Sequence, residues 1–422
     1  MRSTLSVDKT PSRSGLDIAR IREDFPNLGR SMRGKPFVYL DNGATSLKPR
    51  QVIESEIRYY EEYCANIHRG VYEFSEIATE EYDSVRSKVA RFIGAPDDGH
   101  VIFTRGTTES VNVVMHGWGR KNVGQGDVIL ISEIEHHANY VTWQQLAQEK
   151  GARLEFIPAK PDGSFDLSGL DALFEMPVKI VAVTAMSNVT GYKPDIKTII
   201  DTAHRHGVPV LVDAAQYASH HTVNVAELDC DFLCFSGHKM CGPTGIGVLY
   251  GHERMLEDMD PYMYGGDMVV RVKRDTSSFK PLPERFEAGT PNIAGVIGLG
   301  AAVEYLQGIG MDAIAQHEAH LIEYTLARAS EFPDLISYGP SDHSTRGGIF
   351  SFNLGDVHSH DVGSILDQEG IAVRTGFHCA QPIMRLFGVP GTVRASMYLY
   401  NDTDDIDMLF TGLDRVRGIF NR

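Results

Sequence analysis

The sequence predicts an α/β fold with two domains, a large one built on a mainly parallel sheet and a small α+β one at the C-terminus. The chain has 422 residues, which is long enough for two hydrophobic cores. Short apolar runs alternate with amphipathic stretches up to about residue 295, as in a parallel sheet that helices cover on both faces. After that point long helical stretches precede short apolar runs, which indicates a separate, smaller unit.

Eight apolar runs are the expected strands. They are short and continuous, as strands buried on both faces are. In chain order they are Phe37–Leu40, Val101–Thr104, Val128–Ser132, Leu154–Pro158, Ile180–Thr184, Val208–Val212, Asp231–Phe235 and Gly247–Tyr250.

Helical stretches complete the predicted organisation. Ile196–Arg205 is amphipathic and precedes a strand, and two longer helical stretches, Val296–Leu306 and Ala313–Glu331, follow the last strand. We expect an N-terminal arm over residues 1–35, with a disordered start, that contributes to the small domain. The large domain is expected over residues 36–295 and the small domain over residues 296–422.

Composition narrows the function classes. Lys and Arg number 40 against 56 Asp and Glu, a formal net charge of −16, which disfavours a general nucleic-acid binder because phosphates would be repelled. No apolar run reaches 18 residues, and residues 1–16 lack the apolar core of a signal peptide, so we expect no membrane span and a cytoplasmic location. Five cysteines are too few and of the wrong parity for a secreted disulfide scaffold.

Three of the cysteines lie close together in the sequence but do not predict a metal site. Cys230 and Cys234 fall on an expected strand. Thiols four residues apart on a strand lie about 13 Å apart at about 3.3 Å per residue. One zinc ion with bonds of about 2.3 Å cannot join them. We therefore expect Cys230, Cys234 and Cys241 to be packing residues and expect no bound metal.

Polar residues follow several expected strands, where open α/β sheets bind their ligands. Thr107 and Thr108 open a helix after Val101–Thr104, which fits a phosphate site and equally an ordinary helix cap. Asp213 follows the strand Val208–Val212. A buried carboxylate needs a partner, either the protonated ring nitrogen of a cofactor or a loop hydrogen bond.

A lysine ends another strand. Ser236-Gly237-His238-Lys239 follows an apolar run and precedes a Gly-rich turn. A lone lysine is usually a solvated charge, but a lysine in a partly buried pocket has a lowered pKa and becomes a nucleophilic amine. Ser236 and His238 beside it are suited to a phosphate.

Two further segments carry reactive side chains. His136 and His137 follow the strand Val128–Ser132 without a third metal ligand nearby, so one of them stacking on a ligand ring is as simple an interpretation as metal binding. Cys379 lies on a polar, Gly-containing loop between Arg374 and Arg394. Neighbouring cations stabilise a thiolate, whereas the alternative is a buried, inert thiol.

Together these segments supply what pyridoxal 5′-phosphate (PLP) requires: an amine for its aldehyde, an acid for its ring nitrogen and a cradle for its phosphate. Across these segments the chain resembles a known family, the type II (SUF-system-like) cysteine desulfurases and selenocysteine lyases of the class V aminotransferases. The similarity extends from about Ile21 to the C-terminus. Its carriers are YLDN from Tyr39, NIHRG from Asn66, RGTTE from Arg105, EHHAN from Glu135, SNV from Ser187, VDAAQ from Val212, SGHK from Ser236, FEAGTPN from Phe286 and RTGFHCAQP from Arg374.

The resemblance implies PLP-dependent transferase fold type I, similar to aspartate aminotransferase, with a mainly parallel seven-stranded sheet. Lys239 would be the Schiff-base lysine, with His136 stacked on the pyridine ring. Asp213 would pair with the ring nitrogen and Gln216 would contact the ring oxygen. Residues at the phosphate would be Thr107, Thr108, Ser236 and His238, with Thr290 reaching in from a second subunit of a homodimer.

The resemblance also implies a substrate site and a reaction. Asn188 and Arg394 would bind the substrate carboxylate, Arg69 and Arg374 would line the mouth, and Cys379 would accept sulfur from L-cysteine as a persulfide. L-alanine would leave, L-selenocysteine is a possible second substrate, and the sulfur would pass to a SUF-type acceptor protein for iron–sulfur cluster or related biosynthesis. The small domain would carry the Cys379 loop, which is short because Pro382 follows closely.

Three departures from the family pattern concern substrate preference and partner docking. Phe377 stands where many relatives have histidine, as does Tyr72. The segment Tyr264–Asp267 replaces one that is usually richer in Gly and Ser.

Other functions stay open at this point. A selenocysteine lyase, a cysteine lyase or an aminotransferase would share the fold, although a transaminase has no need of Cys379. A non-catalytic PLP-binding scaffold is the alternative from another class. A Rossmann dehydrogenase is disfavoured because no G-x-G-x-x-G follows the first strand.

Overall fold

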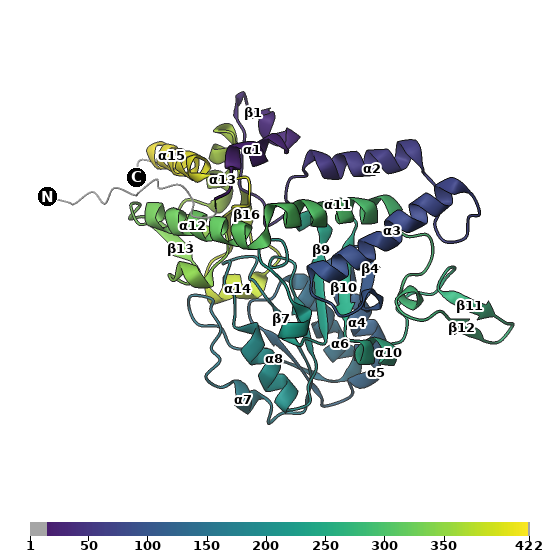
Figure 1. Cartoon of the computed structure of the whole chain (residues 1–422). Coiled ribbons are helices and arrows are strands. Elements are labelled where there is room, and N and C mark those ends of the chain that lie inside the picture. Colours follow the sequence, from purple (N-terminus) through teal and green to yellow (C-terminus); the bar gives the residue numbers. More distant parts are fainter. Residues whose placement is uncertain (1–14, 421–422) are drawn as a thin grey trace.

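A computed structural model describes residues 15–420 (Figure 1). The start of the N-terminal arm, for which we expect disorder, falls on residues 1–14, which lie outside the described residues. The helices are α1 Ile18–Glu23, α2 Arg50–Glu62, α3 Glu73–Phe92, α4 Thr107–Val114, α5 Arg120–Asn122, α6 His137–Lys150, α7 Leu170–Leu173, α8 Ile196–Arg205, α9 Val225–Leu228, α10 Glu253–Asp258, α11 Ile293–Ile309, α12 Met311–Ala329, α13 Ser359–Gln368, α14 Gln381–Leu386 and α15 Thr403–Ile419.

The strands form one large sheet and several small ones. The large sheet has seven strands, in the order β4-β10-β9-β8-β7-β5-β6. They are β4 Val101–Thr104, β5 Val128–Ser132, β6 Arg153–Ile157, β7 Val178–Thr184, β8 Val210–Asp213, β9 Phe232–Ser236 and β10 Gly247–Gly251. Neighbours pair in parallel except β10, which is antiparallel to both β4 and β9. The mainly parallel seven-stranded sheet is thus confirmed.

Alternate side chains of these strands enter two cores on opposite faces. Val210 and Val212 of β8 pack with α3, α8 and α11, whereas Leu211 packs with α4, α6 and α10. The period of two residues explains why the fully buried strands β5, β8 and β9 are apolar except at their carboxyl ends. Polar side chains are therefore left to the strand ends, which is where the candidate site lies.

The C-terminal part of the chain builds a second sheet with its own core. This antiparallel sheet has the order β13-β14-β17-β16 and is covered by α12, α13 and α15. Its strands are β13 Leu335–Tyr338, β14 Ile349–Leu354, β16 Arg374–Gly376 and β17 Thr392–Ser396. The smaller pairs are β1 Ser31–Met32 with β2 Lys35–Pro36, β11 Val269–Val272 with β12 Ser277–Phe279, and β3 Val38–Tyr39 with β15 Ile371–Ala372.

One expected strand lies elsewhere than the alternation suggests. Seven of the eight apolar runs form the large sheet, with ends shifted by at most two residues. Phe37–Leu40 supplies only β3, which pairs with β15 beside the C-terminal core. The pairing joins residues more than 330 positions apart. Local periodicity carries no information about such a partner.

The N-terminal arm is held on the C-terminal part by ion pairs. Arg22 contacts Asp405 at 2.9 Å, and Arg33 contacts Asp367 at 2.9 Å. These contacts hold residues 22 and 33 of the arm against the C-terminal part of the chain. The predicted division after residue 295 falls inside α11, whose buried side chains join the core of the large sheet. Packing therefore favours a division after α11.

Helix α11 packs between α2 and α3 on one side and the large sheet on the other (Figure 1). No single helix of residues 15–420 is long and apolar enough to cross a membrane; α11 and α12 satisfy that test only as a pair, across a bend of 74°.

A buried ion pair ties α3 to the segment that precedes α11. Arg86 contacts Glu287 through two hydrogen bonds, of 2.7 and 2.9 Å. The same carboxylate accepts hydrogen bonds from the Phe103 amide at 2.7 Å and the Tyr82 hydroxyl at 3.1 Å. The pair therefore fixes the segment that leads to Thr290.

We expect Glu287→Ala to lower the free energy of unfolding by about 3–5 kcal/mol, because Arg86 would be left buried without a counter-ion. The matched control is Glu149→Ala, which removes an exposed pair with Arg120 at 2.9 Å and should cost less than about 1 kcal/mol. Denaturant titration followed by circular dichroism measures both. Similar small losses in the two variants would contradict a structural role for the buried pair.

Candidate active site

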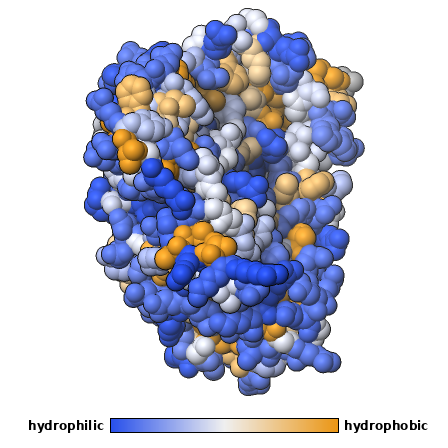
Figure 2. All heavy atoms as spheres, turned by 90° about the vertical axis from the view of Figure 1, so that its right-hand side faces the viewer, coloured by the Kyte–Doolittle hydropathy of each residue, from blue (hydrophilic) through white to orange (hydrophobic). Residues whose placement is uncertain are grey.

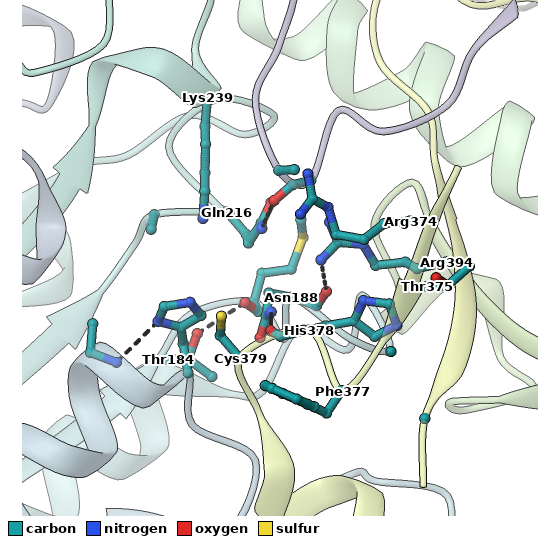
Figure 3. A pocket seen from close by; sticks show the side chains of 18 of the residues that line it. Thr184, Asn188, Gln216, Lys239, Arg374, Thr375, Phe377, His378, Cys379 and Arg394 are labelled. Atoms are coloured by element: carbon teal, nitrogen blue, oxygen red, sulfur yellow. Dashed lines mark hydrogen bonds between the residues drawn. The ribbon is translucent and has the colours of Figure 1, made fainter. Parts of the chain in front are cut away.

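A cavity of about 680 Å³ opens at the carboxyl end of the large sheet, where the C-terminal sheet closes over it. Loops after β4, β5, β7, β8 and β9 supply one side, and the β16–α14 loop with β17 supplies the other (Figure 3). Residues predicted for the site that line it are Thr107, Thr108, His136, Asn188, Asp213, Gln216, Ser236, His238, Lys239, Arg374, Cys379 and Arg394.

Lys239 and Asp213 form the electrostatic centre of the cavity. Lys239 follows β9 and projects into the cavity (Figure 3). Burial lowers the pKa of Lys239 to about 8, although the nearby Asp213 carboxylate works in the opposite direction. A lysine with this pKa has a much larger uncharged, nucleophilic fraction near neutral pH than an ordinary lysine has, although most of the amine is still protonated at pH 7.

Asp213 ends β8 with little solvent contact. Burial raises the pKa of its carboxyl, and its hydrogen-bond donor among the described residues is the Ala215 amide at 2.9 Å. Gln216, on the same turn, donates to the Gly43 carbonyl at 2.8 Å and leaves its own buried Oε1 without a partner. Both groups have acceptor capacity that a ligand with N–H or O–H groups would satisfy.

An anion cradle lies where α4 begins. The Thr107 amide donates to Ser236 Oγ at 2.9 Å, and the two hydroxyls lie 2.7 Å apart. Gly106, the residue before the helix, has a φ of 148° that a side chain would disfavour. Amides at a helix start, together with the hydroxyls of Thr107, Thr108 and Ser236, suit a phosphate.

Two histidines of the cavity are held neutral. His136 precedes α6 and accepts the Ala138 amide on Nδ1 at 3.1 Å. Burial lowers the pKa of His136 to about 3, and the nearby Lys239 works in the same direction. Burial lowers the pKa of His238 to about 4. Neutral rings suit stacking and hydrogen bonding rather than charge pairing.

Arg394 and Asn188 present unused polar atoms to the cavity. Arg394 is 2% exposed and donates to the Asn188 carbonyl at 2.8 Å, yet its Nε is without a partner, as is Asn188 Oδ1. Burial lowers the pKa of Arg394 to about 10, so it stays cationic at neutral pH. A Cβ added to Gly43 would lie 3.1 Å from Cζ of Arg394. The site suits a small carboxylate.

Arg374 lies at the opening of the same cavity. Its Nε and Nη2 donate to the Asp41 carboxylate at 3.0 and 2.8 Å, and Arg394 approaches the same carboxylate at 3.5 Å. Asp41 thus offsets part of the positive charge and fixes the direction of the Arg374 fork.

Cys379 lies on the short loop between β16 and α14 and is exposed. It projects into the cavity from the side opposite Lys239 (Figure 3). Both His378 and Cys379 have positive φ, of 52° and 54°. The Cys379 carbonyl accepts a hydrogen bond from the His137 amide at 2.7 Å, and the Gln381 amide donates to the His137 ring at 3.2 Å. His137 therefore fastens the loop to α6.

Two predicted site residues do not line this cavity. Arg69 is exposed and approaches Asp267 at 3.7 Å, and Thr290 lies on the segment before α11. The contribution of Thr290 from a second subunit stays a prediction. For Arg69 the expected place at the mouth is not seen within one chain.

Sequence reasoning missed the His358–His360 segment. It opens α13 and lines the cavity, with His360 Nδ1 3.0 Å from Thr375 Oγ1. The signal was a His-x-His before an amphipathic helix, but nothing local places that helix beside Cys379. Asp41 was noted only as part of YLDN, and its ion pair with Arg374 was not foreseen.

The three clustered cysteines are buried. Burial raises the pKa of Cys241 to about 12, and it also raises the pKa of Cys230 and of Cys234. They are packing residues, unlike Cys379.

The buried histidines predict how stability depends on pH. His378 is buried, with Nε2 2.9 Å from Thr392 Oγ1, and burial lowers its pKa from 6.5 to about 3. Between these values the unfolded chain binds the proton more strongly, so stability is lost as pH falls below about 6.5. From pH 7 to 5 we expect the apoprotein to lose about 2 kcal/mol through this residue, and His378→Gln to flatten that slope. Denaturant titrations at both pH values test this, and equal slopes would contradict it.

Comparison with known proteins supports the interpretation drawn from the geometry of the cavity. The family model described as Aminotransferase class-V matches residues 38–409. A probable cysteine desulfurase of Halalkalibacterium halodurans is 48% identical over 400 residues, covering 95% of this chain and 98% of the relative. The chain belongs to the class-V aminotransferases, among the cysteine desulfurases. The family resemblance carried by the sequence motifs is thereby confirmed.

Solved structures agree with this placement. The apo cysteine desulfurase of Thermococcus onnurineus superposes with a TM-score of 0.90 at 40% identity, covering 95% of this chain and 98% of that one. The cysteine desulfurase CsdA of Escherichia coli, in an S-sulfonic acid form, superposes with a TM-score of 0.89 at 39% identity, covering 96% and 99%. The predicted fold class is confirmed.

The family implies PLP as cofactor, and the cavity suits it. The amine of Lys239 suits the aldehyde, the buried carboxylate of Asp213 suits a protonated ring nitrogen, and the unpartnered Oε1 of Gln216 suits a ring hydroxyl. The cradle at the start of α4 suits the phosphate.

Proposed function

We propose that this chain is a PLP-dependent cysteine desulfurase that converts L-cysteine into L-alanine and leaves the sulfur on Cys379 as a persulfide. The observation that carries the proposal is that Lys239 and Cys379 project into one cavity from opposite sides (Figure 3). A transaminase needs the lysine but not the thiol.

We propose the following holders for the cofactor. Lys239 would bind the aldehyde, His136 the face of the ring, Asp213 the ring nitrogen and Gln216 the ring oxygen. The phosphate would be held by Thr107, Thr108, Ser236 and His238. When bound, PLP supplies an electron sink for the bonds at the substrate Cα.

The substrate carboxylate would bind to the free Nε face of Arg394 and to Asn188. Asn188 Nδ2 donates to the His378 carbonyl at 2.7 Å, so the group that binds the carboxylate also holds the loop of Cys379. The substrate sulfur is then directed toward the thiol side of the cavity. Arg374 at the opening adds a second positive charge for an anionic substrate.

The chain's own groups account for the proton and sulfur transfers. Lys239 Nζ, whose pKa is lowered to about 8, removes the Cα proton. The Cys379 thiolate attacks the substrate sulfur: the S–S bond forms while the Cβ–S bond breaks. Cβ takes up a proton, and alanine leaves after the Cα proton is returned.

Product analysis tests the proposal. Purified protein with PLP and L-cysteine should release alanine, with persulfide or sulfide in equal amount in the presence of a reductant. Release of pyruvate would indicate a lyase, and a keto acid formed only with an amino acceptor would indicate an aminotransferase. Absence of any turnover would favour the non-catalytic scaffold. L-selenocysteine is proposed as a second substrate, and selenide release tests it.

We propose a SUF-type acceptor protein for the sulfur. The loop between β16 and α14 is short, and His137 fastens it to α6. A thiol with so little reach requires the acceptor to come to it. The cytoplasm, where thiols stay reduced, is the proposed location.

A homodimer is proposed for the face that carries the β11–β12 hairpin. Figure 2 shows apolar side chains gathered around a hollow on this side. The exposed apolar residues of the segments involved are Val71, Tyr72, Phe74, Met263, Tyr264, Val270, Val272 and Phe279. Exposed apolar side chains that lie together on one face are typical of an interface. Thr290 would then reach the partner's cavity, and sedimentation should give twice the chain mass.

A further inference from the structure

The carbonyl that precedes Lys239 is the meeting point of four hydrogen-bond donors. His238 O accepts the Ser46 amide at 3.0 Å and the Thr45 hydroxyl at 3.0 Å. It also lies 3.2 Å from the Ser46 hydroxyl and 2.9 Å from Lys48 Nζ. All four donors come from one segment, residues 45–48, on the loop between β3 and α2.

The same segment holds the other end of the lysine turn. Ser46 Oγ accepts the Cys241 amide at 2.8 Å. Cys241 has a φ of 64°, so the backbone turns sharply there. The His238 carbonyl and the Cys241 amide flank Lys239, and fixing both fixes the direction in which its side chain leaves the backbone.

Lys48 is the one charged donor in this group. Its ammonium also donates to the Ser46 carbonyl at 2.5 Å, and no ion pair within 4.0 Å joins it to a carboxylate of residues 15–420. Burial lowers the pKa of Lys48 to about 8, with Glu56 and Cys241 nearby acting in the opposite direction. The Lys48 ammonium donates to two backbone carbonyls. These hydrogen bonds are stronger than those of a neutral donor, because the donor is charged.

We propose that Lys48 is a positioning residue for the reaction: its ammonium clamps the His238–Lys239 peptide and so sets the aim of the Lys239 amine. Lys48 does not line the cavity and touches no reacting atom. It acts through the backbone of the residue that does. The inference rests on the role proposed for Lys239.

The test compares holoenzymes carrying Lys48→Met, which keeps the chain length and removes the donor, and Lys48→Arg, which keeps the charge. We expect Lys48→Met to bind one PLP per chain but to lower kcat about tenfold, with KM for cysteine within about twofold. The visible absorption of the Lys239–PLP linkage should titrate at a pH about half a unit higher or more, because a nearby positive charge is lost. Lys48→Arg should restore most of both values.

A cofactor-free readout accompanies these measurements. In the apoprotein, amide hydrogen exchange over residues 236–241 should be faster in Lys48→Met than in wild type and near wild type in Lys48→Arg. The control is Lys193→Met, at another partly buried lysine whose pKa is lowered by burial, and it should leave kcat, the titration and the exchange of this turn unchanged. Lys48→Gln provides the same readouts if Lys48→Met does not fold.

Wild-type kcat and titration in the Lys48 variants would overturn the proposal. So would a loss confined to thermal stability, which would make Lys48 a structural brace only. Wild-type protein that forms no borohydride-reducible chromophore at Lys239 would instead refute the proposed function on which the inference rests.

Discussion

Cys379→Ala is expected to abolish sulfur transfer from L-cysteine, with a fall in turnover of about a thousandfold or more, and to leave PLP binding intact. Among the described residues that line the cavity, Cys379 alone offers a thiol that can form a bond to the substrate sulfur. None of the residues proposed to hold the cofactor depends on its side chain. Alanine release and the visible absorption of bound PLP measure the two effects separately.

Cys64→Ala is the matched control, because Cys64 is the other exposed free thiol among the described residues. It should keep wild-type turnover, since Cys64 follows the end of α2 and does not line the cavity. Alanine and sulfide released by Cys379→Ala at the wild-type rate would show that the sulfur leaves without this thiol. Turnover of L-selenocysteine should depend less on Cys379 than turnover of L-cysteine, because selenium leaves more readily than sulfur.

Lys239→Ala is expected to lower turnover by about ten thousandfold, because it removes both the covalent attachment of PLP and the base for the Cα proton. Lys239→Arg keeps a positive charge beside Asp213 but offers no nucleophilic amine, so it should fail equally. Single-turnover measurements of alanine, with PLP content from absorption, check the result.

The two lysine variants separate charge from chemistry. Activity in Lys239→Arg well above that of Lys239→Ala would mean that charge balance at Asp213, and not the amine, is what the position supplies. Lys193→Met again serves as a control for removing a partly buried lysine, and it should turn over like wild type.

The centre of the site could be predicted from sequence because it follows a local rule. Strands buried on both faces accept few polar residues, so Asp213 and Lys239 stand out at the ends of apolar runs. The carboxyl ends of parallel strands meet at one edge, which brings such residues together. The reading of Asp213 as a cofactor partner needed the other segments as well.

The rest depended on contacts between distant parts of the chain. β3 pairs with β15, and Asp41 pairs with Arg374, across more than 330 residues. His358 and His360 reach the cavity only because the C-terminal sheet closes over the large one. Lys48 looks like any loop lysine until the turn at Lys239 is seen against it. No periodicity or spacing in the sequence encodes these contacts, because tertiary packing determines them.

Arg69 marks the limit of a resemblance. Its motif predicted the mouth of the site, yet within one chain it approaches Asp267 outside the cavity. If the proposed dimer forms, the exposed hairpin face brings this region near a partner subunit. Arg69→Ala should then raise KM for cysteine only in the assembled dimer.

The central claim is that sulfur moves from cysteine to Cys379, and mass spectrometry of that residue tests it most directly. Holoenzyme is mixed with one equivalent of L-cysteine carrying a heavy sulfur isotope, quenched with an alkylating reagent and digested. The account predicts a labelled persulfide on the Cys379 peptide and one equivalent of free alanine. Alanine formed with the label only in solution, and none on Cys379 at any time during a single turnover, would contradict it.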